Sequence, residues 1–120
     1  MNKRILVVDD YPDICSALAM LLRGEGYCVD ETTDSSKAEI LIKESRYDVC
    51  LFDYNMKNFN RLDMLRTVKD KNPRCLVFIV SGMPNLAELC GKEINAGLIN
   101  GFISKPFDID ELLQKITASI

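Results

Sequence analysis

Five short apolar runs alternate with longer amphipathic stretches along the 120-residue chain, and this alternation limits its possible folds more than any other feature. The runs lie at residues 5–8, 27–31, 49–52, 75–80 and 102–103. Apolar runs of this length, bounded by polar residues, are typical of buried or half-buried strands. The run at 27–31 is the weakest and alternates, which predicts an edge strand.

The stretches between the runs carry apolar residues at helical spacing. They predict helices over residues 14–22, 38–42, 62–68, 86–94 and 109–120. Gly24 or Gly26 can end the first helix, and Asp34, or one of the two serines after it, can cap the second. The chain therefore reads as five strand–helix repeats.

Apolar strands joined by crossover helices form a parallel sheet with both faces covered. Because such crossovers are right-handed, few topologies remain. We predict an α/β fold with a doubly wound five-stranded parallel sheet, flavodoxin-like (βα)5, in strand order 2-1-3-4-5. The length fits a single domain over residues 1–120. In such sheets the ligand site lies at the carboxyl ends of the strands, between strands 1 and 3.

Composition and charge narrow the classes of function. The net charge is −3 and no dense Lys/Arg cluster occurs, which argues against direct nucleic-acid binding by this domain. No run approaches the roughly 18 apolar residues of a membrane span, and the N-terminus lacks a signal-peptide pattern, so a cytoplasmic location is expected. The chain has five widely spaced cysteines and no histidine, which predicts reduced structural thiols and no zinc site.

Polar residues stand where the buried runs end. Asp9 and Asp10 follow the first run, and Asp53 follows the third. Ser81 follows the fourth run, and Lys105 comes shortly after the fifth. Because parallel strands end at one edge of the sheet, we expect these side chains to converge there.

The charges at this edge need compensation. Two carboxylates about 5 Å apart repel by roughly 3 kcal/mol at an effective dielectric constant of about 20. Three carboxylates would face the ammonium of Lys105, so a divalent cation would balance the charge. Carboxylate and carbonyl oxygens with waters suit Mg²⁺. Alternatively, Asp10 or Asp13 caps the helix that starts near Pro12.

The chain resembles the receiver domain of two-component response regulators over its whole length. The resemblance rests on "ILVVDD" at 5–10, "DVCLFDYNM" at 48–56, "VFIVSG" at 77–82 and "NGFISKPF" at 100–107. It implies a phosphorylation-driven signalling switch, not a conventional enzyme, that catalyses only its own phosphorylation and dephosphorylation. The implied donor is a sensor histidine kinase or a phosphotransfer protein.

By the same resemblance, Asp53 matches the phosphoacceptor. Asp10 and Asp53, with the backbone carbonyl of Asn55, match the Mg²⁺ ligands, and Asp9 matches an acid that acts on the metal through water. Lys105 matches the lysine that pairs with the phosphoryl oxygens.

Two further positions match the switching elements of the family. Ser81 matches the hydroxyl that turns toward the phosphoryl group, and Phe102 matches the aromatic that follows it. Pro106 would follow a cis peptide bond, which is accessible before proline.

The loop after Asp53 departs from the family pattern. Lys57 and Arg61 stand where Pro and Gly are common. Arg does not take a positive φ cheaply, so the resemblance predicts a different backbone path here. Met83 lies two residues past Ser81, and we hypothesise that Met83 and Asn55 tune dephosphorylation.

Two other functions stay open at this point. One is a Mg²⁺-dependent phosphohydrolase with Asp53 as its nucleophile, and the other is a degenerate receiver that acts only by protein binding. A C-terminal effector domain or a downstream protein would receive the signal. The sequence leaves a homodimer open.

Overall fold

The computed structural model describes residues 3–56 and 60–119, which form five strands and six helices; each strand is followed by one helix, except that two helices follow β4. The strands are β1 (Arg4–Val8), β2 (Cys28–Thr32), β3 (Val49–Asp53), β4 (Leu76–Ser81) and β5 (Gly101–Ser104). The helices are α1 (Pro12–Gly24), α2 (Ser35–Glu44), α3 (Arg61–Lys71), α4 (Leu86–Leu89), α5 (Gly91–Asn95) and α6 (Ile109–Ser119).

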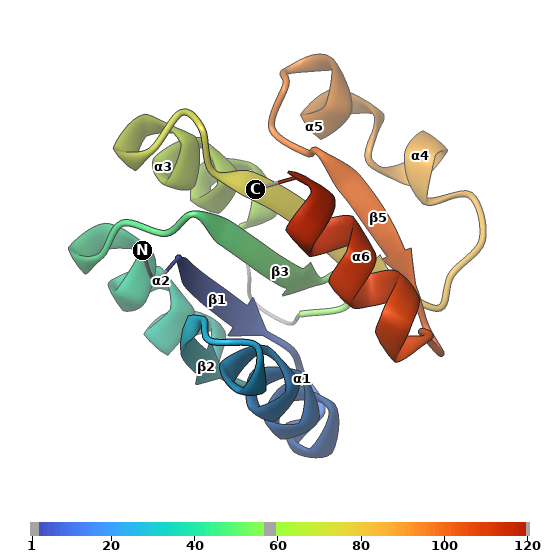
Figure 1. Cartoon of the computed structure of the whole chain (residues 1–120). Coiled ribbons are helices and arrows are strands. Elements are labelled where there is room, and N and C mark those ends of the chain that lie inside the picture. The colour runs from blue at the N-terminus through green and yellow to red at the C-terminus, as the bar shows by residue number, and fades with distance from the viewer. Residues whose placement is uncertain (1–2, 57–59, 120) are drawn as a thin grey trace.

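All neighbouring strands pair in parallel, in the order β2-β1-β3-β4-β5, which confirms the predicted fold and topology. The strands therefore end at the same edge of the sheet, as their arrowheads show (Figure 1). The weakly apolar β2 lies at one edge of the sheet, as its alternating pattern predicted.

Alternate residues of the central strands pack against different helices. Ile5 and Val7 of β1 belong to the core formed with α1 and α6, whereas Leu6 and Val8 belong to the core formed with α2 and α3. All four are at most 1% exposed. Helices thus cover both faces of the sheet (Figure 1), which is why its strands read as continuous apolar runs.

The start of α1 decides between two interpretations of the acids after β1. Tyr11 is the N-cap residue, Pro12 is the first helical residue, and no side chain caps the helix. The alternative that Asp10 or Asp13 caps α1 is therefore wrong. At α2 the expected cap is present, since Oδ1 of Asp34 accepts a hydrogen bond from the Ser36 N–H at 2.9 Å.

The prediction of one helix over residues 86–94 is wrong, because two short helices occupy this segment. The backbone leaves the helical region at Cys90 (φ −104°, ψ 25°), and Gly91, a poor helix former, follows. Asn85 before α4 is left-handed at φ 62°. Among residues 3–56 and 60–119, no helix is long and apolar enough to cross a membrane.

All five thiols are free, and four of them are buried. Cys50 and Cys75 are fully buried, with their Sγ atoms 3.8 Å apart. Burial raises the pKa of the Cys50 thiol well above its usual range, so this thiol is neutral and packs as a small apolar side chain.

We expect Leu22→Ala to lower the free energy of unfolding by about 2–5 kcal/mol, because Leu22 is fully buried between α1 and the sheet. Met20 lies on the same helix but is 71% exposed, so Met20→Ala should change the free energy by less than about 0.5 kcal/mol. Urea unfolding of both variants measures the difference. Equal losses would contradict the assignment of the core.

Candidate functional site

The carboxyl edge of the sheet brings together five of the residues singled out in the sequence. Asp9 and Asp10 directly follow β1, and Asp53 is the last residue of β3. Ser81 is the last residue of β4, and Lys105 directly follows β5. The β3–β4 register sets Asp53 beside Val80, so Asp53 and Ser81 end neighbouring strands.

Lys105 joins the ends of three strands through its side chain. Its Nζ lies 3.0 Å from Oδ2 of Asp9 and 3.6 Å from Oδ2 of Asp53. The two acids are 1% and 2% exposed, and the lysine side chain is 17% exposed. Lys105 is the cation that both acids share, so its removal would leave two buried carboxylates without compensation.

Backbone N–H groups fix the direction of both buried carboxylates. Asp53 accepts hydrogen bonds from the N–H of Asp10 at 3.4 Å and from the N–H of Asn55 at 3.2 Å. Asp9 accepts one from the N–H of Tyr11 at 3.0 Å. Because these donors belong to the loops that follow β1 and β3, the loops orient the carboxylates before any ligand binds.

Burial is the main reason why the pKa of the Asp9 carboxyl lies above its usual value. The hydrogen bonds from Tyr11 and Lys105 oppose this rise, and the nearby charge of Asp53 adds to it. The ionised form of Asp9 is thus held at a cost in stability.

The donor atoms at this edge suit a hard cation. Among the described residues, no three His, Cys, Asp or Glu side chains are grouped closely enough to hold a metal ion by themselves. Mg²⁺, however, usually binds through one or two carboxylates and keeps several waters. The buried carboxylate of Asp53 accepts hydrogen bonds from the N–H groups of Asp10 and Asn55, so the Asp10 carboxylate and the Asn55 carbonyl are near enough to complete such a set.

Ser81 and Lys105 are linked through the backbone as well as by their position. The Lys105 N–H donates to the Ser81 carbonyl at 2.9 Å, and the peptide bond between Lys105 and Pro106 is cis, as predicted. Oγ of Ser81 accepts a hydrogen bond from the Met83 N–H at 3.0 Å. The hydroxyl is therefore engaged within the loop after β4.

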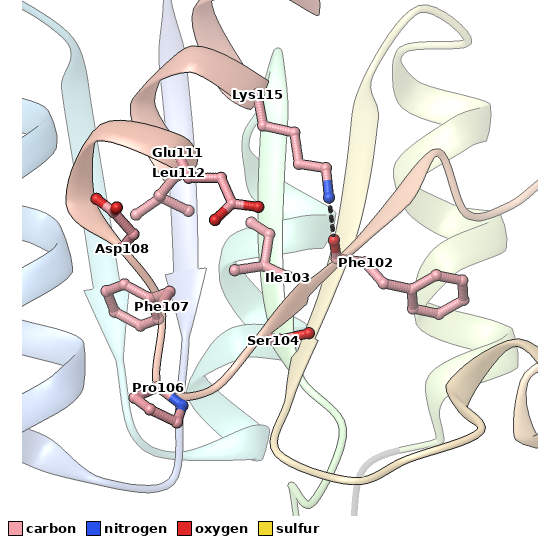
Figure 2. A pocket seen from close by; sticks show the side chains of 9 residues that line it. All are labelled: Phe102, Ile103, Ser104, Pro106, Phe107, Asp108, Glu111, Leu112 and Lys115. Carbon is pink, nitrogen blue, oxygen red and sulfur yellow. Dashed lines mark hydrogen bonds between the residues drawn. The ribbon is translucent and has the colours of Figure 1, made fainter.

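Phe102 lies on β5 and is half-buried against the core formed with α2 and α3. Its ring points away from the shallow pocket between β5 and α6, while its carbonyl accepts a hydrogen bond from Nζ of Lys115 at 2.6 Å (Figure 2). The backbone of Phe102 is thus tied to α6 and its side chain packs on the opposite face of the sheet.

The structure describes one of the two residues that differ from the family pattern in the loop after Asp53. Arg61 is the first residue of α3, and Asn85 is the one non-glycine residue of the described part of the chain with a positive φ. Arg61 therefore takes no left-handed conformation. Lys57 lies outside the described residues.

The sequence did not lead us to predict one neighbour of the site, Tyr11. Nζ of Lys105 lies 5.3 Å from the centre of the Tyr11 ring, and Tyr11 is 59% exposed. A cation over an aromatic ring is stabilised by the electrons of the ring face. An aromatic residue directly after the acid pair was the available signal.

Comparison with known proteins identifies relatives across almost the whole chain. The model of the response regulator receiver domain family matches residues 5–117. The DNA-binding response regulator MtrA of Mycolicibacterium smegmatis is 30% identical over 120 residues, which are 100% of this chain and 51% of that protein. The chain thus spans about half the length of the curated relatives it matches.

Solved structures agree with this fold. A CheY-like response regulator receiver domain protein from Methanospirillum hungatei superposes with a TM-score of 0.86 at 28% identity, covering 98% of this chain and 93% of that one. The chemotaxis response regulator CheY4 of Vibrio cholerae has the same TM-score at 21% identity, with full coverage of both chains, and shows the fold alone.

We expect Asp9→Asn to raise the free energy of unfolding near neutral pH. The pKa of Asp9 is higher in the folded than in the unfolded protein, so the buried charge of Asp9 destabilises the wild type. This loss of stability is complete at pH values above the folded-state pKa, and it disappears as the pH falls from there to the unfolded-state pKa. The advantage of the variant should therefore shrink on acidification. Urea unfolding of both proteins at pH 7 and about pH 4 measures it. If the two free energies of unfolding differed more at the lower pH, this would contradict the burial of the Asp9 charge.

Proposed function

The chain belongs to the response regulator receiver domain family, and from this premise we propose that Asp53 accepts a phosphoryl group in a Mg²⁺-dependent reaction. The proposed donor is a phosphohistidine on a sensor histidine kinase or a phosphotransfer protein in the cytoplasm. The domain would then act as a signalling switch and not as a conventional enzyme, catalysing only its own phosphorylation and dephosphorylation.

One observation carries the proposal: Lys105 reaches both Asp9 and Asp53, although the three residues come from the ends of three different strands. An acid that ends a buried strand, with an ammonium group 3.6 Å away, lies where an incoming phosphoryl group would meet positive charge. Phosphoryl transfer depends mainly on such positioning and on charge stabilisation.

In the proposed reaction an oxygen of Asp53 forms a bond to phosphorus while the bond from phosphorus to the donor nitrogen breaks. Lys105 would stabilise the negative charge on the transferred oxygens. When bound, Mg²⁺ supplies further positive charge to these oxygens, held by Asp10, Asp53 and the carbonyl of Asn55, with Asp9 acting through water. The product is an acyl phosphate, which water can later hydrolyse.

The switch would begin at Ser81. Its Oγ now accepts a hydrogen bond from the Met83 N–H, so a turn toward a phosphorylated Asp53 would release the loop after β4. Phosphorylation adds strong acceptor oxygens near Ser81 and Lys105, which biases the domain toward one arrangement. Phe102, half-buried on the neighbouring strand, would then repack sterically, since its ring has no hydroxyl.

The response to phosphorylation would be produced by another domain or by another protein. We propose that an effector domain C-terminal to this one, or a separate downstream protein, reads the switch, since the matched relatives are about twice as long. Direct nucleic-acid binding by the receiver domain itself is not part of the proposal, because its net charge is −3. Self-association into a homodimer is a further route for the signal.

We expect a small-molecule phosphoryl donor and Mg²⁺ to add one phosphoryl group to the wild type and none to Asp53→Asn, because the amide is not a nucleophile. Intact-mass measurement reads the result. Asp70→Asn, which removes an exposed acid on α3, is the matched control and should react as the wild type does. Omission of Mg²⁺ should abolish the reaction.

Other results of the same experiment favour the other two functions. Steady release of phosphate from diverse phosphomonoesters would favour a phosphohydrolase. A wild type that binds no Mg²⁺ and gains no mass would favour a receiver that acts by protein binding alone, and the proposed function would then be wrong.

We expect Met83→Ala to shorten the lifetime of the phosphorylated form severalfold. Met83 follows Ser81 by two residues and is 43% exposed, so its apolar side chain would hinder water at the site. Asn55→Ala should also change the lifetime, because it removes an exposed polar side chain two residues after Asp53 and keeps the backbone N–H that donates to Asp53. Decay of the phosphorylated mass measures both, with Met20→Ala as the control for an exposed methionine. Unchanged lifetimes in both variants would remove the hypothesis.

A further inference from the structure

Arg61 makes three contacts that connect the loop after Asp53 to α5. Its Nη1 donates a hydrogen bond to the Tyr54 carbonyl at 3.3 Å, and its guanidinium lies 4.4 Å from the centre of the Tyr54 ring. Its Nε lies 3.5 Å from Oε1 of Glu93 on α5. One side chain thus makes a hydrogen bond to the residue after Asp53 and an ion pair with a residue in the segment between β4 and β5.

This ion pair is set apart from the exposed ones by its burial. The side chains of Arg61 and Glu93 are 20% and 11% exposed, and the buried Nε of Arg61 has the ion pair with Glu93 but no hydrogen bond. The exposed pair of Lys43 and Glu39 has side chains that are 59% and 47% exposed. Exposed pairs contribute little, but loss of one partner from a buried pair leaves a charge uncompensated. Arg61 and Glu93 therefore hold each other in place.

The Tyr54 peptide is held from two sides. Its N–H donates to the Val80 carbonyl at 3.0 Å, and its carbonyl accepts from Arg61 at 3.3 Å. The next residue, Asn55, has its N–H bonded to Asp53. The guanidinium is planar and its nitrogens have a fixed arrangement, so the ion pair with Glu93 and the hydrogen bond to Tyr54 restrict each other's direction.

We propose that Arg61 is a positioning residue for the metal-binding loop: it holds the backbone at Tyr54 and Asn55, and Glu93 of α5 holds Arg61. The inference rests on the proposed function, in which the Asn55 carbonyl is a Mg²⁺ ligand. A loop that is already ordered loses less entropy when Mg²⁺ binds. The same link couples α5 to the metal site.

The direction in which Arg61→Ala changes the Mg²⁺ affinity distinguishes a positioning role of Arg61 from an effect of its charge alone. If Arg61 acted on the metal only through its positive charge, Arg61→Ala would remove a repulsion and tighten Mg²⁺ binding. If Arg61 positions the loop, the same substitution weakens Mg²⁺ binding, although it removes a positive charge. A purely structural role would lower stability and leave the affinity unchanged.

We expect Arg61→Ala and Glu93→Gln each to weaken Mg²⁺ binding about fivefold, and the double variant to weaken it little further, because the two residues act as one unit. Titration followed by amide chemical shifts measures the affinity without any phosphoryl transfer. Arg66→Ala on α3 and Glu88→Gln on α4 remove exposed residues of the same types and should bind as the wild type does. Glu93→Gln keeps the shape of its side chain but also removes a negative charge, so if Arg61→Ala fails to fold, the hydrogen-exchange measurement on Glu93→Gln carries the test.

The proposed coupling between α5 and the metal site can also be measured from the side of α5. Because coupling acts equally in both directions, Mg²⁺ should slow hydrogen exchange of α5 amides in the wild type, and this effect should be lost in Glu93→Gln. Equal or tighter Mg²⁺ affinity in both single variants would overturn the positioning role while leaving the proposed function intact. A wild type that binds no Mg²⁺ and accepts no phosphoryl group would overturn both.

Discussion

The ion pairs that Lys105 makes with Asp9 and Asp53 are the interactions on which the site depends. Two nearly inaccessible carboxylates lie close enough to share one ammonium group, and burial already raises the pKa of Asp9. Such an arrangement lowers stability and would be lost in a chain selected for stability alone. Its persistence here is understandable if excess negative charge is kept to attract a divalent cation and, with it, a phosphoryl group.

The parallel sheet makes this concentration of charge feasible. Helices cover both faces, so the strands supply a rigid apolar support, and the acids stand only at its edge, where loop N–H groups orient them. The same geometry places Ser81 on a strand beside Asp53 and ties its carbonyl to Lys105. The ends of β3, β4 and β5 are therefore joined by short hydrogen-bonded steps.

The segment between β4 and β5 contrasts with this support. It consists of two helices of four and five residues, separated at Cys90, and Asn85 before them is left-handed. Helices this short are stabilised by tertiary contacts and not by their own propensity. The largely buried Arg61–Glu93 pair is one such contact, and it connects this segment to the loop after Asp53.

The sequence by itself determined the strand–helix alternation and the residues at the carboxyl edge, because the apolar period and the polar strand ends are local properties. The strand order could also be predicted, because right-handed crossovers leave few topologies for such a chain. The sequence also indicated the cis bond before Pro106 through the resemblance. Only the tertiary structure decided that residues 86–95 form two helices, that Tyr11 packs beside Lys105, and that Arg61 pairs with Glu93. These features depend on contacts between residues far apart in the chain, whose energies no local pattern records.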